Sequence, residues 1–413
     1  MAKVIWIVNP QAGSPGKADN PRYLKFAKYF MDAGYEVITF NSSQREKIEI
    51  PDKRFLEKDY NGYKFVHMYA PNFKGNGVKR MLSLFKFARN LKRFSQNFPK
   101  PDVILQNIHP PFDYPVVKLK KKFKCKYIAE AWDLWPEDFV TFGLVKPNSI
   151  PIKIAYAIEK KYYYAADEIV FTIVGAFDYL KRQGWMKEQG GKIDPAHLHY
   201  INNGIDLEQF DKDRDAHPRT DSDLNDPDIK KIIYLGSISK ANNVKILIDA
   251  AVHMKNLPQY RFFIYGNGTY RPELEQYVKD NHIDNVVFKE TRIPFEECAW
   301  VVSQATVNVM NYDKRFGKWG VSSGKMFQYL AAGKPILCNI DIAYDNVIKD
   351  NKLGASQSFE TPESFVELIR QLAEQSKEDY NAMCERVRDV AKRFDYKVLA
   401  TQELEVIKSV LRS

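Results

Sequence analysis

The sequence predicts an α/β protein built from two doubly wound parallel sheets. Short apolar segments alternate with helical segments along nearly the whole chain, a pattern typical of parallel sheets that carry helices on both faces. At 413 residues the chain is too long for one ordinary core. A polar stretch at 211–227, almost without apolar residues, interrupts the alternation, which restarts beyond it. We therefore expect two domains whose strand carboxyl ends face each other across a cleft.

The first half contains seven apolar runs with strand character, and helical patterns lie between several of them. Strands are expected near Val4–Val8, Glu36–Phe40, Lys64–Tyr69, Val103–Gln106, Tyr127–Glu130, Glu168–Thr172 and Leu198–Ile201. Helices are expected at Arg22–Asp32, Val78–Phe94, Phe112–Lys122, Pro151–Ala166 and Ala176–Gln183.

The second half repeats the design with five further strands. These are expected at Ile232–Leu235, Arg261–Tyr265, Val286–Lys289, Thr306–Met310 and Pro335–Cys338. Helices are expected at Val244–Lys255, Pro272–Asn281, Phe295–Gln304, Gly324–Ala332 and Pro362–Glu374, and in the tail Asp379–Arg412 with a break at Phe394-Asp395. The predicted boundaries are a first domain at 1–205, a linker at 206–230, and a second domain at 231–395. The final helix, 396–413, is expected to pack back onto the first domain.

The hydrophobicity, cysteine content and net charge of the chain indicate where in the cell it acts. No apolar run approaches the ~20 residues of a membrane-spanning helix, and the N-terminus lacks the pattern of a signal peptide. Four scattered cysteines without metal-binding spacing suit a reducing cytoplasm. The net charge of +10 is compatible with binding to nucleic acid, with binding to anionic lipid, or with a surface that is simply solvated. Binding to nucleic acid is the least favoured of the three, because the sequence contains no nucleic-acid-binding motif. We expect a cytoplasmic protein, peripheral on the inner face of the membrane if it binds lipid.

The segment Val78–Phe94 is the candidate lipid-binding element. Apolar and basic residues alternate there at near-helical spacing, so Phe85, Lys86, Phe87 and Arg89 are predicted to face a membrane. The alternative is a helix that packs its apolar face on the core and exposes its lysines to water.

Phosphate chemistry is predicted most strongly in the second half. A serine- and glycine-rich turn, Ser322–Lys325, opens a helix, and the N-terminus of a helix with its exposed N–H groups attracts anions. Lys325 adds a full positive charge. Two other turns follow strands, at Gly236–Asn242 and at Gly266-Asn267-Gly268, and together the three supply N–H donors, hydroxyls and ammonium groups to one edge. Neither G-x-G-x-x-G nor G-x-x-x-x-G-K-[ST] occurs, which disfavours dinucleotide and NTPase sites.

A family resemblance runs from the first strand to the final helix. Asn203-Gly204-Ile205-Asp206 with Phe210, the Gly236 turn, Gly266-Asn267-Gly268 and Ala331-Ala332-Gly333-Lys334-Pro335, in that order, resemble glycosyltransferase family 4. Those are retaining enzymes of the GT-B fold that use nucleotide sugars. The segments Glu130–Glu137 and Gly320–Lys325 are similar to the WbuB-like branch, which builds bacterial surface polysaccharides such as lipopolysaccharide and capsule.

The resemblance implies roles by position. The donor diphosphate would lie on the Gly236 and Ser322 turns, Arg292 would lie near the nucleotide base, and Gln328 would take the place of the glutamate that binds the ribose. With the Gly266 turn, the predicted donor-binding set is Gly236, Ser237, Ser239, Lys240, Asn242, Gly266, Gly268, Arg292, Ser322, Ser323, Gly324, Lys325 and Gln328. In the first domain, Gly13, Ser14 and Gly16 resemble the loop that faces the acceptor, although a plain turn would give the same pattern.

Three departures from the family pattern matter. The paired-glutamate positions are Gly320 and Gln328, and Ser237 replaces the usual arginine, which leaves Lys240 and Lys325 to neutralise phosphate. Trp132 stands where a histidine is usual.

The catalytic candidates are therefore His109, Asp133 and Glu137. Ordinary roles stay open for them, because a histidine before two prolines is often structural and acids after a strand often cap the next helix.

These features predict a hexosyltransferase-type enzyme that moves a sugar from a nucleotide sugar, with UDP preferred, to an acceptor hydroxyl. The predicted partners are the donor and a lipid-linked acceptor at the membrane surface, without nucleic acid, and no metal or cofactor is expected. The alternatives are a nucleotide-sugar-binding subunit without catalysis and a GT-B-fold epimerase or phosphorylase.

Overall fold

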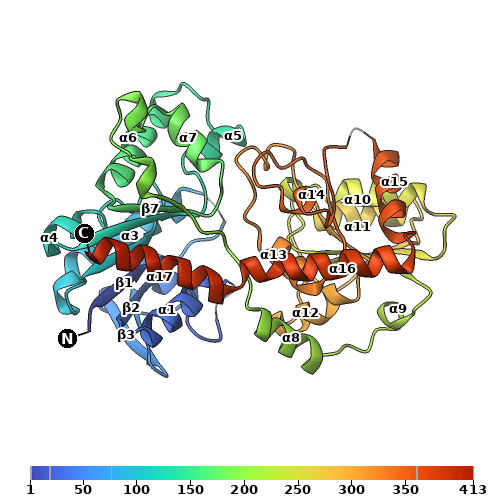
Figure 1. Ribbon diagram of the computed structural model, residues 1–413, viewed down its shortest axis with the longest axis horizontal. Coiled ribbons are helices and arrows are strands. Elements are labelled where there is room, and N and C mark those ends of the chain that lie inside the picture. The colour runs from blue at the N-terminus through green and yellow to red at the C-terminus, as the bar shows by residue number, and fades with distance from the viewer. Residues whose placement is uncertain (1, 18–19, 76, 360, 413) are drawn as a thin grey trace. The chain divides into compact units, whose positions relative to one another are not determined.

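The computed structural model describes residues 2–17, 20–75, 77–359 and 361–412, and it divides the chain into two compact units (Figure 1). Unit 1 comprises the chain up to Asn202 together with the C-terminal segment from Tyr396. Unit 2 is Asn203–Asp395. No helix among the described residues is both long enough and apolar enough to cross a bilayer.

Unit 1 is built on an eight-stranded sheet in the order β3-β4-β2-β1-β5-β6-β7-β8. Every neighbouring pair is parallel except β3 with β4. The strands are β1 (Val4–Val8), β2 (Glu36–Ser42), β3 (Phe55–Tyr60), β4 (Tyr63–Met68), β5 (Val103–Asn107), β6 (Lys126–Ala131), β7 (Glu168–Phe171) and β8 (Leu198–Tyr200). The α-helices are α1 (Arg22–Asp32), α2 (Ser43–Glu46), α3 (Val78–Phe94), α4 (Lys118–Phe123), α5 (Glu137–Thr141), α6 (Ile150–Ala165), α7 (Ala176–Arg182) and α17 (Tyr396–Arg412).

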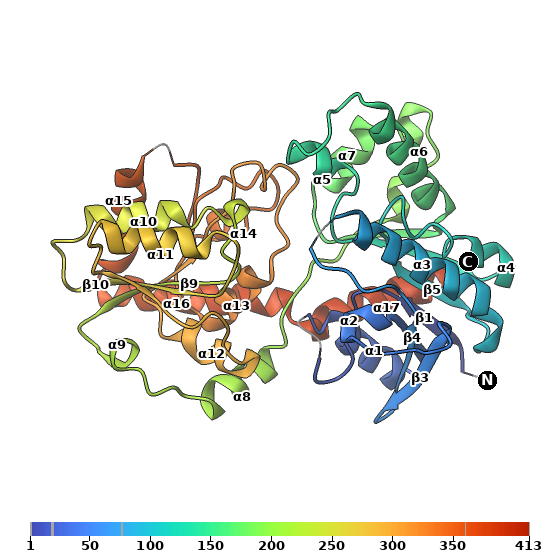
Figure 2. The ribbon, with the colours of Figure 1, turned by 180° about the vertical axis from the view of Figure 1, so that it is seen from behind.

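Helices cover both faces of this sheet because successive side chains of a strand point to opposite sides. Ile5 and Ile7 of β1 are fully buried in the cluster that α1 and α17 complete. Between them Trp6 faces the other side, where its ring meets that of Phe40 at 4.7 Å. The two views show α17 beside α1 in Figure 1 and α3 at the front in Figure 2.

Four polar side chains are buried together where α17 meets α1. Arg22 donates to Glu130 and to the backbone carbonyls of Ile201 and Asn202, the last residues before unit 2. Tyr23 donates its hydroxyl to the same carboxylate. Glu403 of α17 is fully buried with a carboxylate oxygen 3.9 Å from Arg22, and among the described residues neither oxygen accepts a hydrogen bond. Burial raises the pKa of Glu403 to about 8, helped by Glu130 and opposed by Arg22.

Unit 2 is built on a six-stranded parallel sheet in the order β11-β10-β9-β12-β13-β14. The strands are β9 (Lys230–Leu235), β10 (Tyr260–Tyr265), β11 (Val286–Phe288), β12 (Val307–Met310), β13 (Ile336–Cys338) and β14 (Gly354–Ser356). The α-helices are α8 (Leu207–Ala216), α9 (Ser222–Asn225), α10 (Lys245–His253), α11 (Arg271–Asp280), α12 (Phe295–Ser303), α13 (Gly324–Ala332), α14 (Val347–Asp350), α15 (Pro362–Ala373) and α16 (Lys377–Ala391). The strand order is that of the doubly wound dinucleotide-binding fold, with its switch point between β9 and β12.

The predictions for the linker and for the side chain of Phe87 are wrong. Residues 206–230, expected to be a linker, form α8 and α9, and Leu207 and Phe210 of α8 are buried in the core of unit 2. Phe87, expected to face a membrane, is fully buried on the inner side of α3, whereas Phe85 is 46% exposed.

The buried acid at α17 generates a prediction about pH and stability. The folded-state pKa of Glu403 lies above its unfolded value, so the folded protein binds more protons and its stability falls as pH rises from about 4.5 to 8. Glu403→Gln removes this dependence. We expect equal melting temperatures at pH 5 and a variant that melts higher at pH 9, by roughly 3 °C or more. The exposed neighbour variant Glu405→Gln should show no such gain, and a Glu403→Gln protein that melts lower at pH 9 would refute the explanation.

Candidate functional site

The carboxyl ends of β9 and β12 mark the switch point of unit 2, where α/β sheets of this order bind ligands. The turn after β9 begins at Gly236, and the turn after β10 begins at Gly266. Backbone hydrogen bonds join the two turns, from Gly236 to Tyr265 at 3.1 Å and from Ile238 to Asn267 at 2.8 Å. Gly266 has a φ of +118°, and a Cβ there would lie 1.9 Å from the carbonyl oxygen of Gly236. Gly266 is therefore required for the approach of the two turns.

The N-terminus of α13 lies over this switch point. Ser323 is its N-cap residue, but the Ser323 side chain caps no N–H group of the helix and instead accepts a hydrogen bond from Tyr312, at 2.6 Å. The first turn contains no acidic residue. Ser322 accepts a hydrogen bond from Asn203 at 3.0 Å, which ties the turn to the start of unit 2. The helix dipole and this uncapped end together favour an anion.

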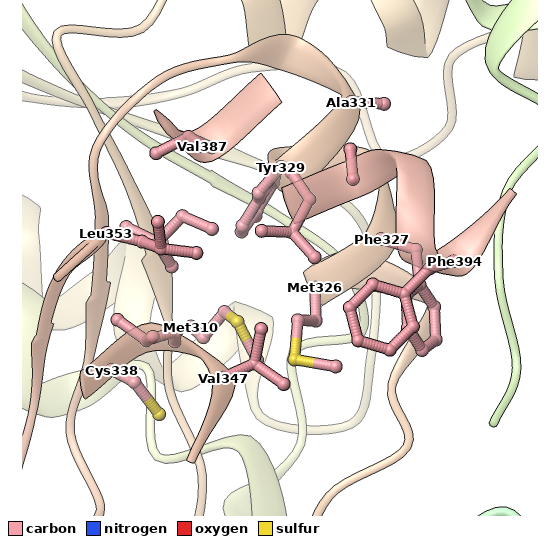
Figure 3. Packing of buried hydrophobic residues seen from close by; sticks show 14 of the residues in the cluster. Met310, Met326, Phe327, Tyr329, Ala331, Cys338, Val347, Leu353, Val387 and Phe394 are labelled. Atoms are coloured by element: carbon pink, nitrogen blue, oxygen red, sulfur yellow. The ribbon is translucent and has the colours of Figure 1, made fainter. Parts of the chain in front are cut away.

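The buried face of α13 fixes its position. Figure 3 shows Met326 and Tyr329 of α13 among Met310, Val347 and other side chains of one hydrophobic cluster. The hydroxyl of Tyr329 accepts the N–H of Leu235, the last residue of β9, at 3.0 Å. The site is thus held by a packed core on one side and by the end of β9 on the other.

Lys325 is the central charged group of the site. Its ammonium lies 3.2 Å from both the Tyr234 hydroxyl and the Asn242 amide oxygen, and 4.7 Å from the ring centres of Tyr234 and Tyr312. No carboxylate within the described ranges pairs with it. Burial lowers the pKa of Lys325 to about 8, and it raises the pKa of both tyrosines, so these neighbours are neutral at pH 7. The uncapped first turn of α13 therefore carries a positive charge that no carboxylate of the described residues compensates.

Gly236 makes room for this lysine. A Cβ at Gly236 would lie 2.9 Å from the Cδ atom of Lys325 and 3.4 Å from its Nζ atom. A side chain at this position would therefore push the ammonium away.

The other predicted donor residues lie around this point at different depths. Asn242 is half-buried and donates its amide N–H to the Ser239 hydroxyl at 2.9 Å, while Lys240 is exposed with its ammonium 5.5 Å from the Tyr270 ring centre. Gln328 is half-buried one turn along α13, and Ser237 is exposed. Arg292 is exposed in the loop before α12, and no contact joins it to Lys325.

Unit 1 gathers a second set of polar residues after β5 and β6. The ring of His109 contacts Asp113 through Nδ1 at 3.2 Å, and the carboxylate of Asp113 also accepts the N–H of His109 and the hydroxyl of Tyr162. Holding Nδ1–H in this way leaves Nε2 as the basic atom of the ring. Asp133 is accessible to solvent, but the protein atoms around its carboxylate desolvate it and raise its pKa. The electrostatic influence of His109 and Arg80 opposes this effect and lowers the pKa.

Glu137 does not share this arrangement. It is 1% exposed, it accepts a hydrogen bond from Tyr156 at 2.6 Å, and it forms an ion pair with Arg182 at 2.6 Å. The structure gives it the role of an anchor between α5, α6 and α7 rather than that of a catalytic acid.

The Gly13–Gly16 turn is fastened to α2. Ser14 is buried and donates both its N–H and its hydroxyl to Glu46, at 2.8 and 2.9 Å. Its side chain is therefore occupied, and Gly13 is buried while Gly16 is exposed with a φ of +77°. Any contact of this loop with a ligand comes from its backbone.

Comparison with known proteins decides the class of the molecule. Residues 219–390 match the family model described as "Glycosyl transferases group 1". They form a glycosyl transferases group 1 domain. A curated relative, the probable glycosyltransferase WbjE of Pseudomonas aeruginosa, is 21% identical over 325 residues, which cover 76% of each chain. The present chain is a glycosyltransferase.

Solved structures show that this glycosyltransferase has the GT-B fold. Sucrose-phosphate synthase from Thermosynechococcus elongatus is similar with a TM-score of 0.73 and 16% identity, over 99% of both chains. WaaG, a glycosyltransferase involved in lipopolysaccharide biosynthesis, gives 0.65 and 14% over 98% of this chain and 99% of its own. HepE of Anabaena, in complex with UDP and glucose, gives 0.64 and 13% over 98% and 100%.

Several site residues were missed by sequence reasoning. Tyr234 and Tyr312 enclose the Lys325 ammonium, Asp113 orients His109, and Glu46 holds Ser14. Asp113 had a signal, because it stands four residues after His109 beyond two prolines. The tyrosines had none, since aromatic residues at strand ends are ordinary core residues.

The Lys325 environment predicts a variant that gains stability. Its folded-state pKa of about 8 lies below the 10.5 of an ordinary lysine, so holding the charge costs stability below pH 8, and the cost disappears as pH rises towards 10.5. In the absence of ligand, Lys325→Met should be more stable than the native protein at pH 7, by about 1 to 3 kcal/mol. Denaturation at pH 7 and pH 10 measures this. The exposed control Lys240→Met should change little, and a destabilised Lys325→Met protein at pH 7 would contradict the assignment of an unpaired charge.

Proposed function

We propose that this glycosyltransferase moves a sugar from a UDP-sugar to a hydroxyl of a lipid-linked glycan in the assembly of a bacterial surface polysaccharide, with retention at the anomeric carbon. The observation that carries the proposal is the unpaired Lys325 ammonium beside an uncapped helix N-terminus in a glycosyl transferases group 1 domain. The UDP bound by HepE supports the nucleotide. The role of WaaG in lipopolysaccharide biosynthesis and the resemblance of Glu130–Glu137 to the WbuB-like branch support the acceptor class.

The donor half of the reaction depends on charge that develops on the leaving diphosphate. As the bond between the sugar and the diphosphate lengthens, negative charge grows on the phosphate oxygens. In the proposal, Lys325 and the N–H groups at the start of α13 stabilise that charge without rearrangement, because the core of unit 2 already fixes them. Ser322 and Asn242 supply further polar contacts, while Gln328 contacts the ribose. The carbohydrate hydroxyls of the donor have no assigned partner, because Gly320 replaces an acid of the family pattern.

The acceptor half depends on a base in unit 1. We assign that role to His109, since Asp113 holds its Nδ1–H and leaves Nε2 to receive the proton of the acceptor hydroxyl. Asp133 lies close enough for its charge to act on His109 and would stabilise the imidazolium. Glu137 is left out, because Arg182 and Tyr156 occupy its oxygens.

An assay of UDP release that determines kcat and KM separately tests this assignment. In an assay with UDP-sugars and a lipid extract, Lys325→Met should raise the KM for the donor at least tenfold, because it loses a charged phosphate contact. Asp113→Asn should lower kcat about 10² to 10⁴-fold with an unchanged Kd for UDP, because it acts in unit 1.

The same assay separates the alternatives. UDP binding without UDP release in any extract would mean a binding subunit without catalysis, and an epimer or sugar phosphate formed from the donor alone would mean an epimerase or phosphorylase. Either result contradicts the proposal.

Association with a membrane surface is the second testable part. The outer side of α3 exposes Val78, Leu82 and Phe85, which are 68%, 59% and 46% accessible, and exposed Arg89 continues the same face. Lys86 is half-buried beside it. An apolar stripe flanked by basic side chains is the composition of an interfacial helix.

Flotation with anionic vesicles measures the association. The double variant Leu82→Ser/Phe85→Ser should reduce the bound fraction several-fold, because it removes apolar area from the lipid contact. Phe295→Ser, which changes an equally exposed phenylalanine of unit 2, should leave binding intact. If the native protein and both variants bind the vesicles equally, α3 does not contribute to membrane association.

A further inference from the structure

A large hollow in unit 1 is lined by residues that take no part in the proposed catalysis. Its volume is about 1000 Å³, and its walls are α2 with the turn that follows it, residues 69–74 after β4, and Lys79. Neither His109 nor Asp133 lines it. The size suits a ligand as large as a nucleotide or a short glycan. We call this hollow the basic groove, after the residues that line it.

The charge of the basic groove is strongly one-sided. Lys47, Lys53, Lys74 and Lys79 line it, all four are exposed, and no carboxylate among the described residues pairs with any of them. Glu49 is the one acid in the lining. Four like charges around one hollow repel each other, and an anion in the hollow would relieve that repulsion.

Two of the lysines are held in an uncommon backbone conformation. Lys47 follows α2 with a φ of 55°, and Lys53 lies in a turn with a φ of 54°. Non-glycine residues adopt this region at a cost, and Asn or Asp adopts it more readily than Lys.

The remainder of the lining is apolar and aromatic. Tyr69, Phe73 and Ile48 are half-buried in the groove, and Ile50 is buried beneath it. Lys79 is the second residue of α3, so the groove opens beside the exposed stripe of Val78, Leu82 and Phe85. The lysines of the groove and the apolar stripe of α3 therefore meet at Val78 and Lys79, which are neighbours in the chain.

We propose that the basic groove binds the phosphate or diphosphate group of an acceptor whose hydrocarbon chain runs along the exposed stripe of α3. Ammonium groups act as point charges that neutralise phosphate from several directions, which suits a flexible, doubly charged group. That the bound molecule is the acceptor rests on the proposed function, whereas the binding of a phosphate group rests on the charge and shape of the groove alone. The groove would thereby hold the substrate by its anchor and leave its sugar end free to reach the catalytic residues.

Binding of farnesyl diphosphate tests the proposal. The measurement uses the Lys325→Met background, in which the donor diphosphate site is disabled, and a ligand concentration below the one at which micelles form. Changing Lys47, Lys53, Lys74 and Lys79 together to Gln should weaken binding about tenfold or more. A control with the same loss of charge, in which exposed Lys121, Lys124, Lys153 and Lys161 become Gln, should stay within about twofold. The four Lys→Arg changes in the groove should restore binding, because they keep the charge.

Three results would overturn the inference. Equal binding of farnesyl diphosphate by the groove and control variants would mean a general electrostatic effect. No binding by the protein with an unaltered groove would remove the ligand. Loss of binding to phosphatidylglycerol vesicles alone, with farnesyl diphosphate still bound, would assign the groove to the bilayer.

UDP binding by the protein with Lys325 intact is measured in parallel. If the protein with Lys325 intact does not bind UDP, the proposed function is contradicted and the result for the groove remains valid. If it binds UDP but the groove variant binds farnesyl diphosphate as well as the native groove does, only this inference is contradicted.

Discussion

The proposed donor site depends on one charge without a counter-ion at the switch point of unit 2. The Lys325 ammonium lies between the rings of two neutral tyrosines, with an amide and a phenol as its hydrogen-bond partners and no carboxylate bonded to it in the described part of the chain. A buried charge without a counter-ion is costly in free energy, and such arrangements persist where function requires them. In the proposed function, the diphosphate of the donor supplies that counter-ion.

The surrounding features follow from that requirement. Gly236 has no Cβ, so the lysine can lie over the end of β9. Gly266 lets the next turn close against Gly236, and Tyr329 fastens α13 to Leu235. Because a hydrophobic core holds α13 from behind, the charged end of the helix stays in place when the ligand is absent (Figure 3). In the proposed mechanism this fixed geometry acts as preorganisation, because the helix end would need no rearrangement as charge develops on the leaving diphosphate.

The two-sheet fold and the phosphate turns could be predicted from sequence because they depend on local patterns. Alternating strands and helices, and glycine or serine turns after strands, are visible in any window of the chain. The edge strand β3 was not predicted, since its residues from Phe55 to Tyr60 are mostly exposed and lack an apolar run. The helix predicted from Phe112 begins only at Lys118, because Asp113 turns back to bind His109.

What could not be predicted depends on contacts between distant segments. Residues 206–230 look polar, yet Leu207 and Phe210 suffice to bury one side of α8. Phe85 and Phe87 are both plausible lipid contacts by composition, and only the packing of α3 decides which of them is exposed. That no carboxylate in the described part of the chain pairs with Lys325 or with the lysines of the basic groove is likewise a property of three-dimensional neighbours. Sequence identifies the charges, and only the structure shows which of them lack a carboxylate partner among the described residues.

A crystal structure of the complex with UDP tests the central claim most directly. The account predicts that a β-phosphate oxygen lies within hydrogen-bond distance of the Lys325 Nζ atom, with further oxygens facing the N–H groups at the start of α13. A UDP molecule bound elsewhere, while Lys325 keeps its contacts with Tyr234 and Asn242 and the helix end faces only water, would contradict it.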